Sequence, residues 1–164
     1  MPPLLSHYFK GICMYTRQQA SLLKQEFWTI FGKYISPVLS AEGEKINWIN
    51  YKTGIRHIAF KMQAGSNAAD ISIELTHTDP ELRDEFFKKF ILLKDELHQI
   101  LSEEWNWEPD KTDEFGKQFS RIGFKLSTVS IFNKEHWPQL ISFFKPRIIA
   151  LDAFWAEYKF VFES

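Results

Sequence analysis

The stretch that decides the fold is residues 57–77, HIAFKMQAGSNAADISIELTH. Apolar and polar side chains alternate with period two in His57–Gln63 and again in Ala69–His77. The apolar set is Ile58, Phe60, Met62, Ile71, Ile73 and Leu75. This period predicts two antiparallel strands, each with one face on a core and the other toward solvent or a partner. The short connection between them favours a meander.

Further strands are expected on both sides of this pair. Ile46–Tyr51 is predicted as a strand before it, while Trp105–Trp107 and Lys117–Leu126 are predicted after it. Three helical regions separate these runs. The first begins at Thr16, the second runs from Thr78 to about Leu101, and the third runs from Asn133 to about Phe160, with Pro146 kinking or splitting it.

The order α-β-β-β-α-β-β-α predicts the α+β class. We expect an antiparallel sheet of about five strands with three or four helices packed mainly on one face. The 164 residues suit one domain, assigned to residues 15–164, preceded by an N-terminal arm at residues 1–14.

Aromatic residues are unusually abundant, with 16 Phe, 6 Trp and 5 Tyr. So much aromatic area implies a rigid core, a buried interface, or both. A homodimer is predicted, with the C-terminal helix or the open face of the sheet as the contact. Alternatively, the N-terminal arm covers this apolar surface with Leu4, Leu5, Tyr8 and Phe9, and the protein is then a monomer.

Charge, cysteine usage and hydropathy set further limits. Residues 65–114 hold five Lys/Arg against fourteen Asp/Glu, although the net charge of the chain is −1. The one cysteine, Cys13, excludes an internal disulfide and a cysteine metal cluster, and suits a reducing cytoplasm. No apolar run is long enough to span a membrane, and the N-terminus lacks a signal pattern. A cytoplasmic location without membrane contact is expected.

Catalytic motifs are missing from the sequence. It has no GxSxG, no phosphate-binding GxxxxGK[ST] and no GxGxxG, and its histidines form no metal-binding pair. We therefore expect no catalytic residues, no metal and no cofactor, and enzyme status is disfavoured.

A helix, three strands, a helix and a strand also open restriction-endonuclease-like domains. Their metal site needs carboxylates on the second and third strands and a lysine near them. The sequence offers only degenerate positions for it, at Glu26, Lys61, Asp70 and Glu74.

Two other sets of residues are candidates for binding. Basic and aromatic side chains interleave at Lys45, Trp48, Tyr51, Lys52, Arg56 and Lys61, an arrangement that suits stacked bases and phosphates. Polar residues near loop ends, where function concentrates, give a candidate pocket at Glu42, Glu44, Asn47, Asn50 and Arg121.

Ser40–Ile55 (SAEGEKINWINYKTGI) and Val129–Trp155 (VSIFNKEHWPQLISFFKPRIIALDAFW) resemble a prokaryotic family known as domain of unknown function 4268. The resemblance runs from about Tyr15 to Phe162. It implies an accessory role near DNA metabolism or defence, because members occur alone or attached to endonuclease-like modules. The family has no established catalytic residues to carry over.

The function expected from the sequence is a small non-enzymatic cytoplasmic binding module that forms a homodimer and has a protein partner. The alternative is a nucleic-acid-associated domain with a degenerate restriction-endonuclease-like fold.

Overall fold

The computed structural model describes residues 16–163. One antiparallel sheet, in the order β1-β2-β4-β3, consists of Ile58–Ala64 (β1), Ala68–Leu75 (β2), Asn106–Thr112 (β3) and Gln118–Ser127 (β4). The α-helices are Arg17–Ile35 (α2), Pro80–Leu92 (α3), Lys94–Leu101 (α4) and Trp137–Tyr158 (α5). Short 3-10 helices lie at Lys134–His136 (η1) and Lys159–Phe162 (η2). The predicted arm, residues 1–14, lies outside the described residues.

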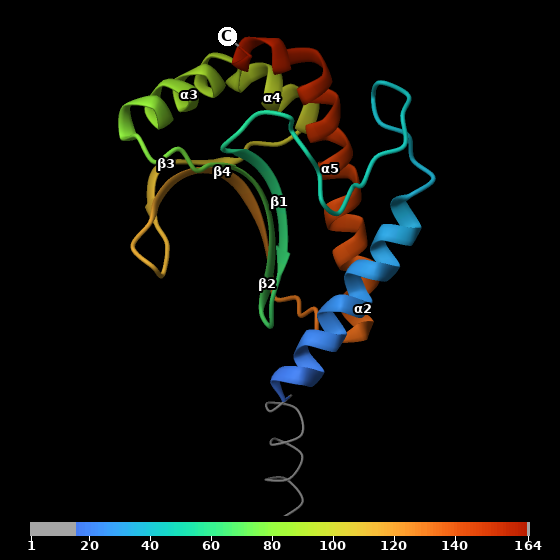
Figure 1. Ribbon diagram of the computed structural model, residues 1–164. Coiled ribbons are helices and arrows are strands. Elements are labelled where there is room, and N and C mark those ends of the chain that lie inside the picture. Colours follow the sequence, from blue (N-terminus) through green and yellow to red (C-terminus); the bar gives the residue numbers. More distant parts are fainter. Residues whose placement is uncertain (1–15, 164) are drawn as a thin grey trace, which may run out of the picture.

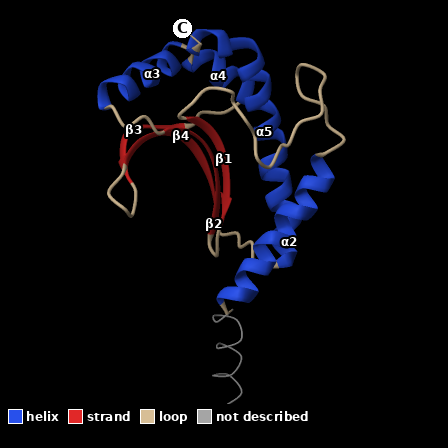
Figure 2. Ribbon diagram, viewed as in Figure 1, coloured by secondary structure: helices blue, strands red, loops and turns tan. Residues whose placement is uncertain are grey.

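The sheet is strongly curved, and the helices lie along its outer, convex side (Figure 1). The colouring by secondary structure shows the same two layers, with none of the described helices on the inner, concave side (Figure 2). Helix α5 contacts β1 and β2, while α3 contacts β2 and β4. The α+β class with an antiparallel sheet is therefore confirmed, with four strands in place of about five.

The prediction of a strand at Ile46–Tyr51 is wrong. The side-chain oxygen of Asn47 accepts hydrogen bonds from the backbone N–H groups of Ile49, at 3.2 Å, and Asn50, at 3.1 Å. This arrangement is a turn, and it competes with strand pairing for the backbone. Trp48 is only 2% exposed, and its indole N–H donates to the carbonyl of Val38 at 2.9 Å. The apolar residues of this stretch therefore anchor an irregular segment.

Side-chain caps explain where α2 and α3 begin, whereas α4 and α5 have no side-chain cap among residues 16–163. Thr16, the predicted start of the first helix, caps α2 through a capping box with Gln19. Asp79, and not Thr78, caps α3 by accepting from the backbone of Glu81 at 3.0 Å. The single helix expected over residues 78–101 is two helices, because the chain leaves helical geometry at Leu93.

Pro146 lies inside α5, which is one helix and is not split. Proline supplies no N–H to the preceding turn, so carbonyls there lose a donor. The carbonyl that loses its helical donor is that of Ser142, four residues earlier, while the neighbouring carbonyl of Phe143 accepts from Nη1 of Arg147 at 2.9 Å.

The aromatic excess lies mostly inside this one chain. One cluster joins α2 to α5 through Phe27, Phe31, Trp137 and Phe144. A second cluster joins β1, α3, α5 and η2 through Phe60, Phe90, Phe154, Trp155 and Phe162. All nine are buried, and each large apolar side chain contributes about 1.5–3 kcal/mol when fully buried. Among residues 16–163, no helix combines the length and hydropathy of a membrane span.

Candidate functional site: the concave face of the sheet

The period-two alternation that places apolar side chains in the core also places polar side chains on the opposite face of the sheet. The apolar side chains of β1 and β2 face the helices, so their alternate residues face the concave side. Pairing sets the positions of the polar residues across the strands. Lys61 and Gly123 both lie opposite Ser72, and Arg121 lies opposite both Glu74 and Glu108.

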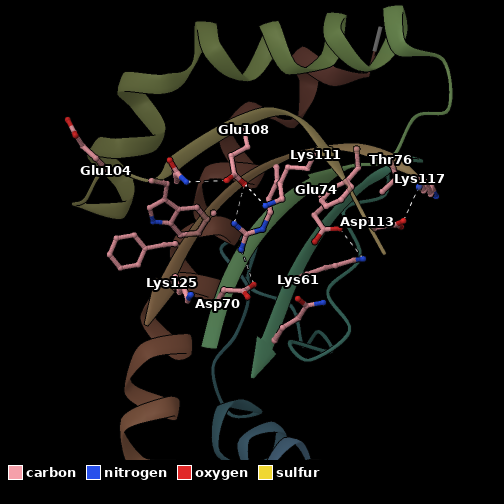
Figure 3. Close-up of a pocket in the computed structure, with 17 residues that line it drawn as sticks. Lys61, Asp70, Glu74, Thr76, Glu104, Glu108, Lys111, Asp113, Lys117 and Lys125 are labelled. Atoms are coloured by element: carbon pink, nitrogen blue, oxygen red, sulfur yellow. Dashed lines mark hydrogen bonds and ion pairs between the residues drawn. The ribbon is translucent and has the colours of Figure 1, made fainter. Parts of the chain in front are cut away.

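Ion pairs link all four strands on this face (Figure 3). Lys61 lies 3.1 Å from Glu74, and Arg121 lies 3.0 Å from Asp70. Glu108 Oε2 is buried, with Lys111 Nζ at 3.2 Å and Arg121 Nη1 at 3.8 Å. The Arg121 side chain is only 16% exposed, so its pairs are screened less by solvent than pairs on a flat surface.

Arg121 lies face-on against the backbone of the sheet. A Cβ atom added to Gly123 would lie 2.5, 2.6 and 2.8 Å from Nη1, Cζ and Nη2 of Arg121. These three atoms belong to one planar group and are almost equally distant from the added Cβ atom, so that atom lies above the plane of the guanidinium. The flat face of the guanidinium therefore faces Gly123. Its opposite face points away from the sheet, into the hollow that Arg121 lines.

The hollow on the concave face has a volume of about 930 Å³. Lys61, Lys111, Lys117, Arg121 and Lys125 line it together with Asp70, Glu74, Glu104, Glu108 and Asp113. Trp105, Phe119 and Phe124 add aromatic surface to the lining. The hollow is therefore polar and carries equal numbers of formal positive and negative charges.

The nuclease-like positions are only partly brought together. Lys61, Asp70 and Glu74 share the concave face, whereas Glu26 lies on α2 and pairs with Lys134 at 3.0 Å. No group of three or more His, Cys, Asp or Glu side chains within residues 16–163 is placed to hold a metal ion. The order that motivated the comparison also differs, because two strands, and not three, precede α3.

The candidate nucleic-acid residues do not form one surface. Trp48 belongs to the core, and Tyr51 is half-buried with its ring stacked on Phe60 at 5.1 Å. Neither ring offers the open platform on which bases stack. Lys61 points into the concave hollow, while the other cations, Lys45, Lys52 and Arg56, are exposed.

The candidate pocket residues fall into two places. Glu42, Glu44, Asn47 and Asn50 all line a second cavity, of about 400 Å³, beside the end of α5. Arg121 lines the concave hollow.

Asp152 is a buried carboxylate in this second cavity that the sequence reasoning missed. It is 6% exposed and accepts hydrogen bonds from the backbone of Ala41, at 2.7 Å, and from the Tyr51 hydroxyl, at 2.6 Å. Burial, this hydrogen bond and the charges of Asp152 and Glu42 raise the pKa of Tyr51, so its hydroxyl remains a donor. The available signal was a single carboxylate within the apolar run IIALDAF of residues 148–154.

The fold and this face define an α+β protein with helices on the convex side of a curved sheet and an open, polar concave side. A family model described as a domain of unknown function (DUF4268) matches residues 23–159. The chain belongs to this family. No curated protein and no solved structure matches it.

Proposed function

We propose that the protein is a non-enzymatic binding module whose binding surface is the concave face of the sheet, and that its partner is a protein. The observation that carries this proposal is the orientation of Arg121. Its guanidinium lies flat on Gly123 and presents its other face to the hollow. A planar cation held in this way is suited to stack against an aromatic side chain of the partner.

Preorganisation supports the proposal. A mobile arginine side chain on a protein surface loses rotamer entropy when a partner binds it. The side chain of Arg121 is already held in place by Asp70 and Glu108 before binding. Arginine is also enriched among the residues that dominate binding energy. The partly exposed Phe119 and Phe124 offer further contact area in the same hollow.

Curvature and charge favour a protein partner over the alternatives. Two concave faces cannot fill one another, so this face is poorly suited to pair with its own copy. Phosphate groups would meet five carboxylates as well as five cations in the hollow, which weakens the electrostatic attraction that dominates nucleic-acid binding. A partner that presents a convex, mixed-charge surface with an exposed aromatic residue fits better.

Selection from a random peptide library on the immobilised full chain tests this function. We expect the selected peptides to contain an aromatic residue and to lose about tenfold or more in affinity for Arg121→Ala. Arg56→Ala is the matched control, because Arg56 is an exposed arginine outside the hollow. Equal binding to wild type and Arg121→Ala would contradict the proposal. Salt-sensitive retention on single-stranded DNA or RNA would favour the nucleic-acid alternative instead.

Two expectations from the sequence stay proposals. The proposal of a homodimer rests on the apolar side chains that are exposed in the single chain, such as Leu92 at 79% and Phe160 at 69%. A cytoplasmic location depends on the single cysteine.

A further inference from the structure

The second cavity lies between the irregular segment of residues 36–57 and the C-terminal end of α5. Its volume of about 400 Å³ is within the range of small-molecule sites. Ile46 and Trp155 supply apolar lining, and the polar lining includes Asn50, Tyr51 and Asp152. The cavity is thus large enough for a small metabolite and has both kinds of contact.

Specific hydrogen bonds hold the walls of this cavity in place. Asp152 binds the backbone of Ala41 and the hydroxyl of Tyr51. The indole N–H of Trp155 donates to the carbonyl of Thr53 at 2.7 Å. An irregular segment this long in a compact domain is usually functional or disordered, and these buried bonds show that it is ordered.

Charges of both signs line the cavity. Glu42, Glu44, Lys52 and Lys159 all line it, and none of them makes an ion pair with any residue of the described range 16–163. This contrasts with the concave face, where Arg121, Lys61 and Lys111 are neutralised by neighbouring carboxylates. The free charges of the second cavity are available to a ligand.

The ammonium group of Lys159 occupies space that is open because residue 54 is a glycine. Its Nζ atom lies 2.6 Å from where a Cβ atom of residue 54 would be. Gly54 has a φ of +78°, a conformation that favours glycine, so the absence of a side chain serves both the turn and the ammonium group. The ammonium group of the half-buried Lys159 therefore lies against Gly54, at the edge of the cavity.

We propose that this cavity binds a small zwitterion that carries a carboxylate and a protonated amine, such as a free α-amino acid. Lys159 receives the carboxylate. Glu42 and the free lone pairs of Asp152 receive the ammonium group. Glu42 lines the same cavity as Tyr51 and Asp152.

Titration of the ¹⁵N-labelled full chain by NMR tests the site, with the common L-amino acids as probes at up to about 10 mM. We expect at least one amino acid to shift resonances of residues 40–54 and of the end of α5. Its N-acetyl and amide derivatives, which each lack one charge, should bind about tenfold or more weakly. No shift with any amino acid, or binding of either derivative as tightly as the parent amino acid, would overturn the proposal.

Substitutions separate this site from its surroundings and from the concave face. Lys159→Met and Glu42→Gln should each weaken binding of the best probe about tenfold or more. Lys45→Met is the matched control, since Lys45 is exposed on the same segment but does not line the cavity. Arg121→Ala should also leave binding unchanged. Unaltered affinity in Lys159→Met would overturn the proposal, as would equal losses in Lys159→Met and Lys45→Met.

Discussion

The guanidinium of Arg121 covers the backbone of Gly123 so closely that no larger residue fits at position 123 without moving it. Arg121 is at the same time the link between β2 and β3 on the concave face, through Asp70 and Glu108. The position of the arginine therefore depends on a residue that has no side chain.

Gly123→Ala is predicted to displace Arg121 from Asp70. In wild type, the loss of about 1 kcal/mol from the ion pairs should offset the gain of about 0.5–1 kcal/mol that alanine gives over glycine in a strand. In the Arg121→Ala background only the gain remains, so the same substitution should stabilise. Urea denaturation of the four chains measures this coupling. Identical effects of Gly123→Ala in both backgrounds would show that Arg121 does not lie over Gly123.

Tyr51→Phe is predicted to destabilise the fold by about 1.5–3 kcal/mol, the range for a hydrogen bond to a charged group. The phenol donates to Asp152 at 2.6 Å, and its removal leaves a buried carboxylate with one fewer donor. Tyr34→Phe is the control, because Tyr34 is 55% exposed, and its effect should stay within about 0.5 kcal/mol. Equal urea midpoints for the two variants would contradict this account of Asp152.

The sheet could be predicted from the sequence where one face is apolar and the other polar. Alternation placed β1, β2 and β4 within a few residues, and the same alternation assigned Asp70 and Glu74 to one face. Ile46–Tyr51 was also predicted as a strand, although the adjacent Trp48 and Ile49 would place apolar groups on both of its faces. That prediction failed because Asn47 captures two backbone N–H groups and Trp48 packs into the core. Neither event leaves a signal in the spacing of apolar residues.

The candidate sites were harder to predict because they depend on contacts between distant segments. Asp152 meets Tyr51 across 101 residues of sequence, and Arg121 meets Asp70 only through the pairing of β2 with β4. Period and capping are local signals and cannot show such pairs. The clustering of polar residues near loop ends did place Glu42, Glu44, Asn47 and Asn50 together, since these residues lie on one short segment.

His77→Phe is predicted to reduce the loss of stability in mild acid. His77 is 3% exposed, its Nδ1 has no hydrogen-bond partner among residues 16–163, and its ring stacks on Phe86 at 4.6 Å. Burial, followed by the charges of His57 and Arg83, lowers the pKa of His77 below its ordinary value of 6.5.

Below about pH 6.5 the unfolded chain therefore binds a proton that the folded chain does not. The free energy of unfolding therefore decreases as the pH is lowered, until the pH is below the pKa of His77 in the folded chain. Urea midpoints at about pH 7.5 and pH 5.5 measure this loss in wild type and variant. A loss in His77→Phe as large as that of wild type would rule out His77 as its source.

Trp155→Asp is predicted to unfold the chain and not merely to separate two copies. Trp155 is 3% exposed, donates to Thr53 and packs against Phe60 and Phe162, so a carboxylate there would be buried without a partner. Circular dichroism and light scattering on the variant test this. A folded variant of lower mass would instead place Trp155 in an interface between copies.

Leu92→Asp tests the homodimer without disturbing the core. Leu92 is 79% exposed at the end of α3, so a carboxylate there stays in water and the fold should persist. If copies associate through the exposed apolar side chains, wild type should scatter at twice the mass of one 19.4 kDa chain at micromolar concentration. The variant should then approach the mass of a single chain, because a charge in an apolar contact is costly. A wild-type mass of one chain would reject the homodimer. A dimer that Leu92→Asp leaves intact would move the contact to another surface.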